Sequence, residues 1–515
     1  MRLLLRWLLQ IATWPLRWRF ERSCQSPRAA QTKVLERLAS AIAQTDYGQH
    51  YGVVDAASFR NKLPIVDYEA LEPWMERQRD KESQAIVPGR VILYEKTSGS
   101  SGPAKYIPYN RAIRWSFTRM FLLWASNVAN SINRFGEGKL YFSVSPSFGE
   151  REVTHQGRQV GLEDDRDYLS GPVRWLMNAF LVESPGREET STPEAFKAAV
   201  VKRLLATKDL ESISVWNPSF LTMLLDWAVE ARETLSRENL LWEAEPARRE
   251  AFCEDPPRWT EVWPKLKFIS TWSDANARPL ADGLRQEFPG VYVQGKGLLA
   301  TEAPMTIPWF KVVGGVPLVE DVYFEFENDS GELFELHELA LDHCYEVIIS
   351  QAAGLCRYRM RDIVRVVGFF GKTPTLEFLG RGNRVSDLVG EKLNETFVGK
   401  VLNSVLTEES RYRMLVPTQI DRRRYILLVD QMDSSPIEVG AAVEAELAKA
   451  YHYNHARILG QLDAVEVVVD EGAAEKMGAF YQRNGLKLGD IKQGYLAVRL
   501  ADASLLESLK GTSAS

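Results

Sequence analysis

The chain has 515 residues, of which 45 % are hydrophobic and 26 % charged, values typical of a globular protein with more than one domain. Its formal net charge is −6, from 63 basic and 69 acidic residues, so no basic excess points to nucleic acid as a partner. Four cysteines without paired spacing and six scattered histidines argue against a disulfide framework and a zinc site, and favour a reducing, cytoplasmic location.

The first 22 residues, MRLLLRWLLQIATWPLRWRFER, form a basic extension rich in arginine and tryptophan. The longest uncharged run, Trp7–Leu16, is too short for a membrane-spanning helix, which needs about 20 apolar residues. No small-residue cleavage site of a signal peptide follows. Two interpretations stay open: an amphipathic helix peripheral to the inner membrane surface, or a helix packed on the protein's own body, which is favoured.

Hydrophobic periodicity predicts the next elements in chain order. Helices are expected over 28–46 and 111–130, and short strands on either side of a polar loop at 97–105. Residues 212–230 have the pattern of a buried strand, a proline-led turn and a helix, whereas the polar stretch 232–259 is the best candidate for a surface insertion.

From residue 264 onward a strand–helix–strand rhythm appears, followed by alternating strands and turns over 322–367 that indicate antiparallel sheet. A new α+β pattern starts after residue 381, with helices over 394–408 and 438–451 separated by apolar strands. The predicted fold class is α/β: a large N-terminal domain of mixed β-sheets with helices, residues 1–380 with a basic extension at 1–25, and a small α+β domain at 381–515.

The loop TSGSSGPAK, residues 97–105, has the composition of a phosphate-binding segment, although it is not a Walker P-loop. Its glycines allow a close backbone approach, its hydroxyls offer rotatable donors, and Lys105 adds a point charge. Composition alone favours a flexible surface loop, whereas the position after a strand and the terminal lysine suit phosphate binding.

Three motifs in order carry a resemblance to a known family. TSGSSGPAK resembles the phosphate-loop signature of adenylate-forming enzymes, GLLATEAPMTIP (297–308) resembles their threonine–glutamate segment, and YRMRDIVRVVGF (358–369) resembles their tyrosine–arginine…aspartate strand. VWNPSFLTMLL, YFEFE, GLCRYRMRD and HYNHARILGQL are similar, more closely, to the auxin-responsive acyl acid amido synthetase family (the Gretchen Hagen family), in its bacterial type. The resemblance covers nearly the whole chain after residue 25.

This resemblance implies an enzyme, a carbon–nitrogen bond-forming ligase that needs ATP and Mg²⁺. A carboxylic acid is activated as acyl-AMP, and an amine, commonly an amino acid, then takes the acyl group as an amide. The large domain would be the adenylate-forming domain that binds ATP and the acyl acid. The small domain would be mobile about the hinge GRGNR, residues 380–384.

The resemblance also implies roles for particular residues. Glu302 matches a metal-linked glutamate, Asp362 an aspartate that accepts the ribose hydroxyls, and Lys392 and Lys492 are candidate catalytic lysines, with Lys487 as a rival to Lys492. Expected nucleotide-binding residues are Thr97, Ser98, Gly99, Ser100, Ser101, Gly102, Lys105, Ser273, Asp274, Thr301, Glu302, Asp362 and Arg381.

The sequence departs from the family pattern in two places that bear on the ribose and adenine sites. Arg361 stands where the wider superfamily has glycine, and Leu298 stands where an aromatic residue often stacks on adenine. These departures, together with the arginine–tryptophan N-terminus, keep open a catalytically impaired nucleotide-binding or membrane-associated protein. A coenzyme A ligase that uses the same adenylate is a further alternative, although no long basic tract for its 3′-phosphate is visible. His155, His452 and His455 are interpreted as polar or partly buried residues, and Trp115, Phe117, Phe121 and Trp124 as core rather than an acyl-binding wall.

Overall fold

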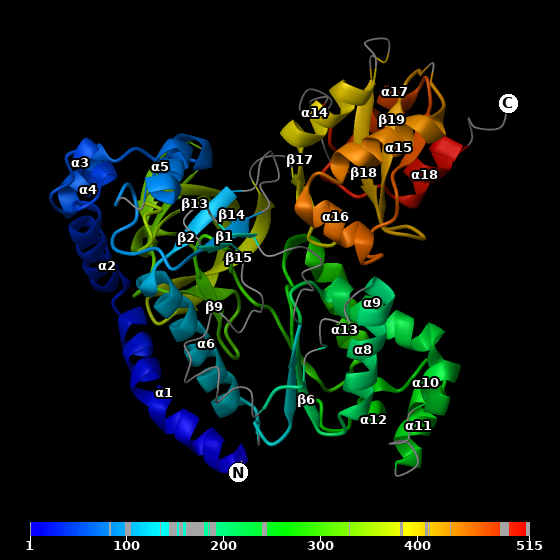
Figure 1. The fold of residues 1–515 in the computed structure, drawn as a ribbon, viewed down its shortest axis with the longest axis horizontal. Coiled ribbons are helices and arrows are strands. Elements are labelled where there is room, and N and C mark those ends of the chain that lie inside the picture. Colours follow the sequence, from blue (N-terminus) through cyan, green and yellow to red (C-terminus); the bar gives the residue numbers. More distant parts are fainter. Residues whose placement is uncertain are drawn as a thin grey trace. The chain divides into compact units, whose positions relative to one another are not determined.

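A computed structural model describes residues 2–81, 84–97, 105–133, 135–143, 152–153, 158–160, 180–183, 185, 192–238, 245–328, 330–381, 385–406, 410, 412–432, 434–484 and 494–510. The main division of the chain falls between Gly380 and Arg381. The larger unit comprises Met1–Thr97 and Lys105–Gly380, and Arg381–Ser515 belongs to the smaller unit (Figure 1).

The larger unit begins with five helices and a hairpin that leads into a long helix. The helices are α1 (Arg2–Cys24), α2 (Pro27–Ile42), α3 (Asp46–His50), α4 (Ala56–Lys62) and α5 (Tyr68–Lys81). The hairpin joins β1 (Leu93–Thr97) to β2 (Lys105–Tyr109) and is followed by α6 (Arg111–Ser131). The side chain of Asn110 accepts hydrogen bonds from the amides of Ala112 and Ile113 and so fixes the start of α6.

Helix α1 packs lengthwise beside α6 (Figure 1), with Phe20 and Cys24 fully buried. Arg19 Nε and Ser23 Oγ each donate to Glu320 Oε1 at 2.8 Å, so α1 is tied to the body of the larger unit by charge as well as by apolar contact. The interpretation of residues 1–22 as a helix packed on the protein's own body therefore holds for its inner face.

Three sheets form the body of the larger unit. One has the order β2-β1-β5-β4 and includes β4 (Glu152–Val153) and β5 (Gln159–Val160). A parallel sheet has the order β3-β6-β7-β8, from β3 (Lys139–Phe142), β6 (Leu210–Ser214), β7 (Phe268–Ser270) and β8 (Tyr292–Gln294). Its connections run through α8 (Pro193–Ala206), α9 (Pro218–Glu230), α10 (Arg232–Glu238), α11 (Pro246–Cys253), α12 (Trp259–Val262), η4 (Ala275–Ala277) and α13 (Arg278–Glu287). This is the strand–helix–strand rhythm that the sequence predicts.

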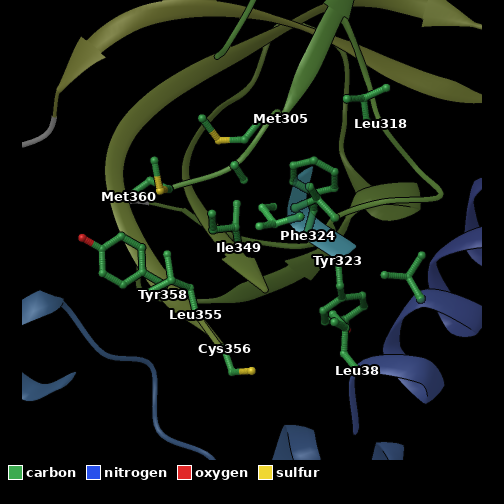
Figure 2. Close-up of a cluster of buried hydrophobic side chains, with 14 of the residues drawn as sticks. Leu38, Met305, Leu318, Tyr323, Phe324, Ile349, Leu355, Cys356, Tyr358 and Met360 are labelled. Atoms are coloured by element: carbon green, nitrogen blue, oxygen red, sulfur yellow. The ribbon is translucent and has the colours of Figure 1, made fainter. Parts of the chain in front are cut away.

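The third sheet is antiparallel where its pairings are defined, with the order β12-β11-β13-β14-β15-β10-β9. Its strands are β9 (Thr306–Pro308), β10 (Gly315–Pro317), β11 (Tyr323–Glu327), β12 (Leu333–Glu335), β13 (Cys344–Ser350), β14 (Tyr358–Phe370) and β15 (Thr373–Arg381), with the short helix η5 (Leu336–Glu338) between β12 and β13. Met305, Phe324, Ile349 and Met360 belong to one buried cluster on this sheet (Figure 2).

The smaller unit is a separate α+β fold. A three-stranded sheet, β18-β19-β20, is formed by β18 (Arg413–Thr418), β19 (Arg424–Val429) and β20 (Glu466–Val469), and a ribbon pairs β16 (Val385–Ser386) with β17 (Leu393–Asn394). The helices are α14 (Glu395–Val405), α15 (Pro436–Leu447), α16 (Tyr451–Ile458), α17 (Ala473–Arg483) and α18 (Ala503–Lys510). Separate apolar clusters, centred on Leu427 and Leu428, lie on the two faces of β19.

The predicted fold class is confirmed, but the interpretation of 232–259 as a surface insertion is wrong. Helices α10 and α11 occupy much of this stretch, and Phe252 and Trp259 are buried there. Trp259 stacks on Trp263 with ring centroids 5.3 Å apart, and Trp263 Nε1 donates to the carbonyl of Leu204 at 2.9 Å. A few aromatic anchors thus hold a segment whose average composition is polar.

Candidate active site

The β1–β2 hairpin brings the two ends of the predicted phosphate loop together. Thr97 and Lys105 pair across the hairpin as the residues that flank the loop, while Ser98, Gly99, Ser100, Ser101 and Gly102 lie outside the described residues. Lys105 Nζ lies 3.9 Å from Glu69 Oε1 and 5.2 Å from the centroid of the Tyr68 ring, both on α5. Lys105, the first residue of β2, therefore lies at the end of the loop and in contact with α5.

Thr301 and Glu302 occupy the two central positions of a tight turn. Ala300 and Ala303 exchange both backbone hydrogen bonds, each at 3.2 Å, which leaves Thr301 and Glu302 at the tip. The Tyr109 hydroxyl donates to the Thr301 carbonyl at 2.6 Å. Because Tyr109 ends β2, the strand that follows the phosphate loop directly supports the turn that carries Glu302.

The Glu302 side chain is only 9 % exposed. Among the residues that the structure describes, it makes no hydrogen bond or ion pair, although an ionised carboxylate at low exposure needs a compensating charge. The described part of the chain holds no cluster of three metal-binding side chains. A hard carboxylate that acts as the single protein ligand matches Mg²⁺, whose remaining ligands are commonly water and substrate phosphates. Glu302 therefore fits the expected metal.

Asp362 is 4 % exposed and lies in a bulge of β14. The pairing of β13 with β14 passes from Glu346↔Ile363 to Ile348↔Arg359, so Met360, Arg361 and Asp362 lie opposite a single residue of β13. Arg361 has φ = 64°, the left-handed conformation that favours glycine. Bulges of this kind occur frequently beside active sites.

Arg361 therefore differs from the glycine of the wider superfamily in its side chain but not in its backbone conformation. Arg361 keeps the conformation that glycine would adopt, and its guanidinium lies 3.6 Å from Asp67 and 3.9 Å from Glu346. Leu298, the other departure, is buried in the same apolar cluster as Met305 and Met360. The chain therefore retains the backbone course of the ribose motif.

Ser273 and Asp274 follow β7 at the carboxyl end of the parallel sheet. Ser273 Oγ lies 3.3 Å from Asp274 Oδ1, and a Cβ on Gly295 would come within 2.3 Å of Ser273 Oγ, so the ends of β7 and β8 approach closely. Asp274 Oδ2 accepts a hydrogen bond from the Phe378 amide at 3.4 Å. Burial raises the pKa of Asp274. Asp274 therefore joins the parallel sheet to β15, a positional role that the sequence does not reveal.

A polar and aromatic group at this sheet edge was missed by the sequence interpretation. Lys296 Nζ donates to Ser214 Oγ at 2.7 Å and lies 5.0 Å from the centroid of the Trp216 ring. The Trp216 and Trp272 rings are 6.0 Å apart. The predicted strand–helix–strand pattern could have pointed to this group, because ligands of parallel sheets bind beyond the carboxyl ends of the strands.

The aromatic residues of α6 divide between core and sheet edge. Phe117 is buried in the core, as expected, whereas Trp115 is exposed. Trp124 Nε1 donates to Gln294 Oε1 at 3.0 Å, at the end of β8. Trp124 is therefore in contact with the carboxyl edge of the parallel sheet.

In the smaller unit, Lys392 ends a compact loop that begins at Ser386. Glu391 is buried and accepts hydrogen bonds from the amides of Leu388 and Val389, at 2.7 and 2.8 Å, and from the Tyr425 hydroxyl. Burial, with a contribution from the charge of Asp387, raises the pKa of Glu391 to about 7. Lys392 itself has φ = 49°. The loop therefore fixes the backbone of Lys392 through the side chain beside it.

His452 lies near Lys392 within the same unit. Burial, and then the charges of Lys392 and His455, lower the pKa of His452 to about 3. Both histidines are half-buried, as the sequence interpretation favours. Arg381 ends β15, whereas Lys492, Lys487 and His155 lie outside the described residues.

Comparison of the sequence with protein-family models assigns the chain to a known family. The model of the GH3 family N-terminal domain matches residues 17–238, and that of the GH3 family central domain matches residues 315–381. The chain belongs to the GH3 family, the Gretchen Hagen family of amido synthetases. The predicted family is confirmed, whereas its bacterial type stays a prediction.

Individual relatives are distant but extensive in coverage. The 4-substituted benzoates-glutamate ligase GH3.12 of Arabidopsis thaliana is 22 % identical over 431 residues, which cover 73 % of this chain and 72 % of that protein. The jasmonoyl–L-amino acid synthetase JAR4 of Nicotiana attenuata is 22 % identical over 71 % of each chain. The solved structure of the AtGH3.15 acyl acid amido synthetase in complex with 2,4-DB has a TM-score of 0.65 and 18 % identity, and covers 98 % of this chain and 96 % of that one.

Proposed function

We propose that the protein is an ATP-dependent acyl acid amido synthetase that activates a carboxylic acid as acyl-AMP and transfers the acyl group to an amine. The observation that carries the proposal is the pair of buried carboxylates, Glu302 and Asp362, each held by backbone geometry in the motif expected for it. Family membership and the names of the relatives, which conjugate acyl acids to amino acids, agree with this activity.

In the first step a carboxylate oxygen of the acid attacks the α-phosphorus of ATP, and the bond from that phosphorus to the bridging oxygen breaks to release pyrophosphate. Lys105 and the hydroxyls of the 97–102 loop would hold the departing phosphates, where negative charge accumulates. Thr301 would contact the α-phosphate, Asp362 would accept both ribose hydroxyls, and Ser273 and Asp274 would lie beside adenine.

Glu302 would hold Mg²⁺ together with oxygens of ATP. The ion, when bound, supplies positive charge to the phosphates as the leaving group departs. The protein's own contribution is the rigid turn at Ala300–Ala303, which fixes the position of this carboxylate without the help of a neighbouring basic residue in the described part of the chain.

In the second step the amine nitrogen attacks the acyl carbon, the bond from that carbon to the AMP oxygen breaks, and the nitrogen loses a proton. We expect an amino acid as the amine, as in the relatives. Rotation of the small domain about residues 380–384 between the steps, and roles for Arg381, Lys392 and Lys492 on the nucleotide, remain part of the proposal. We expect the acyl group to lie near Trp216 and Trp272 at the carboxyl edge of the parallel sheet.

The alternative of an impaired nucleotide-binding or membrane-associated protein rests on Arg361, Leu298 and the arginine–tryptophan N-terminus. Arg361 preserves the backbone of the ribose motif and Leu298 is a core residue, so the first two grounds weaken, whereas the N-terminus is unaffected. A coenzyme A ligase remains the competing enzymatic function, because it shares the first step and differs only in the acceptor.

The decisive experiment measures pyrophosphate release from ATP and Mg²⁺ with a broad panel of carboxylic acids. We expect at least one acid to stimulate release, and mass analysis with amino acids or coenzyme A to show an amide and no thioester. Thioester formation would reassign the acceptor. No stimulation by any acid, together with no ATP binding by calorimetry, would reject the adenylating function.

The cellular location of the protein, and any partner other than ATP, the acid and the amine, also stay predictions. No helix in the described part of the chain is long and apolar enough to cross a membrane. A bacterial type and a cytoplasmic location are expected from the sequence alone, and peripheral membrane contact through residues 1–22 concerns the face of α1 that does not pack on α6.

A further inference from the structure

The outer face of α1 carries a row of large apolar side chains that the fold leaves uncovered. Trp7 is 63 % exposed, Ile11 65 %, Trp14 64 % and Trp18 50 %. Their spacing of four, three and four residues places them within about 60° of one another around a helix of 3.6 residues per turn. The row runs for about 16 Å along the helix, given a rise of 1.5 Å per residue. We call these four residues the tryptophan stripe.

The stripe is separate from the side of α1 that holds the helix in the fold. Phe20 and Cys24 are buried, and Arg6 and Gln10 donate to the Ala129 carbonyl of α6, each at 3.2 Å. Scattered exposed apolar residues are ordinary, but three tryptophans on one face of a helix, each at least half exposed among the described residues, are not. The contacts of the inner face are enough to hold α1 on the larger unit. The exposed outer face is therefore a candidate binding surface.

The charge of α1 limits what that partner is. The helix contains five arginines, Arg2, Arg6, Arg17, Arg19 and Arg22, and one acidic residue, Glu21. Arg19 is paired with Glu320 of the body and Arg6 donates to α6, so these two do not face a partner. Arg17 Nε lies 2.8 Å from Glu21 Oε1, so the single acid beside the stripe is already paired. The Arg22 guanidinium lies 5.3 Å from the centroid of the Trp18 ring, which keeps a positive charge at the end of the stripe.

We propose that the tryptophan stripe binds the surface of a membrane that contains anionic phospholipids. Tryptophan prefers the boundary between headgroups and acyl chains, and arginine attracts anionic headgroups. The stripe is long enough for a helix that lies in the plane of the membrane, and its aromatic rings project away from the protein body. The protein would thus act while attached peripherally to the membrane surface.

A second copy of the chain fits the stripe less well. A twofold contact through this face would pair the stripe with itself and bring two helices with excess positive charge together. A helical protein partner would be expected to meet leucine or isoleucine at the seam rather than a row of tryptophans. Arg22, which lies against Trp18 at the end of the stripe, favours a partner with negative charge.

The test uses the full-length protein and vesicles of phosphatidylcholine, with or without about 30 % phosphatidylglycerol, as a stand-in for an anionic leaflet. We expect co-sedimentation with the anionic vesicles only, and a decrease when salt is raised, because surface charges are screened. Replacing Trp7, Trp14 and Trp18 together by serine should lower the partition coefficient at least about tenfold. The matched control is Trp115→Ser, an exposed tryptophan on α6 outside the stripe, which should bind like the wild type.

Two further measurements make the result decisive. Arg22→Glu should weaken binding to anionic vesicles while the tryptophans remain, and brominated lipids should quench the fluorescence of the wild type more than that of the triple variant. Circular dichroism checks that the variants are folded. Equal binding by wild type and triple variant would overturn the proposal, as would a dimer that the triple variant disrupts without any vesicle binding. Acid-dependent pyrophosphate release in solution should be unchanged in the triple variant, so failure here is distinct from failure of the proposed function.

Discussion

The turn that carries Glu302 and the bulge that carries Asp362 place two buried carboxylates by different physical means. The turn at Ala300–Ala303 closes on its own backbone hydrogen bonds and is held by one tertiary contact, from Tyr109. The bulge instead depends on a left-handed Arg361, a conformation that costs about 1–3 kcal/mol in a residue with a side chain. The proposed metal-binding carboxylate is thus placed by local geometry, and the proposed ribose-binding carboxylate by strain that the surrounding sheet maintains.

Removing either carboxylate should have the largest effect and should separate the two roles. Glu302→Gln and Asp362→Asn are each expected to lower acid-dependent pyrophosphate release about 1,000-fold. Glu302 would hold the ion at the phosphates where charge develops, and Asp362 would position the nucleotide through its ribose. Calorimetry should show that Asp362→Asn weakens ATP binding even without Mg²⁺, whereas Glu302→Gln retains Mg²⁺-free binding. The exposed Glu332→Gln is the control and should behave as the wild type. Near-normal rates in both site variants would refute the assignment of these residues.

A third buried carboxylate, Glu391 in the smaller unit, sharpens the contrast because its oxygens are engaged within its own loop. Its pKa is raised from 4.5 to about 7, so the folded state binds more protons than the unfolded state between these values. Stability from this group is therefore present below pH 4.5 and lost as the pH rises through 7. The loss is on the order of 3 kcal/mol.

Urea denaturation at pH 5 and pH 8 tests this expectation. Glu391→Gln should gain stability relative to the wild type at pH 8 and little at pH 5, while Glu438→Gln, on the exposed first turn of α15, should show no such pH difference. His452 acts in the opposite sense, because its lowered pKa makes the unfolded state bind more protons between about pH 3 and 6.5. A Glu391→Gln effect that does not change with pH would contradict the buried acid.

Substitution of Arg361 tests the strain at the bulge directly. Arg361→Gly and Arg361→Val both remove the ion pairs with Asp67 and Glu346, so their difference isolates the backbone. We expect Arg361→Val to be less stable than Arg361→Gly by about 2 kcal/mol, because a β-branched side chain tolerates positive φ poorly. The KM for ATP should follow the same order. Equal stabilities in thermal unfolding would mean that the bulge does not impose the left-handed conformation.

The sequence predicts helices, strands and the family well where the evidence lies in short continuous segments. Alternation and periodicity place the strands around 97–105, the strand and helix of 212–230 and the antiparallel region 322–367, and the spacing of three motifs identifies the family. It failed for 232–259, where average polarity hid the buried residues Phe252 and Trp259. A few large side chains outweigh composition once they meet a partner surface.

The geometry of the site lay beyond the sequence because it depends on pairings between distant segments. Nothing in YRMRD shows that its pairing with β13 slips by two residues, and hence that Arg361 takes the glycine conformation and does not destroy the motif. Likewise, the hydrogen bond from Tyr109 to Thr301 joins residues 192 positions apart. Only the folded structure relates the first motif to the second.

That hydrogen bond gives the smallest expected effect and the most specific one. Tyr109→Phe removes a donor to the Thr301 carbonyl and should cost about 1 kcal/mol of unfolding free energy. Acid-dependent kcat/KM should fall by up to about tenfold, because the turn that holds Glu302 loses its support. Tyr47→Phe removes the same atom at a buried site where the hydroxyl has no partner in the described part of the chain, so it should leave both quantities unchanged. If both variants behave alike, the turn keeps Glu302 in place through its own backbone bonds, and the link between the two motifs contributes nothing to catalysis.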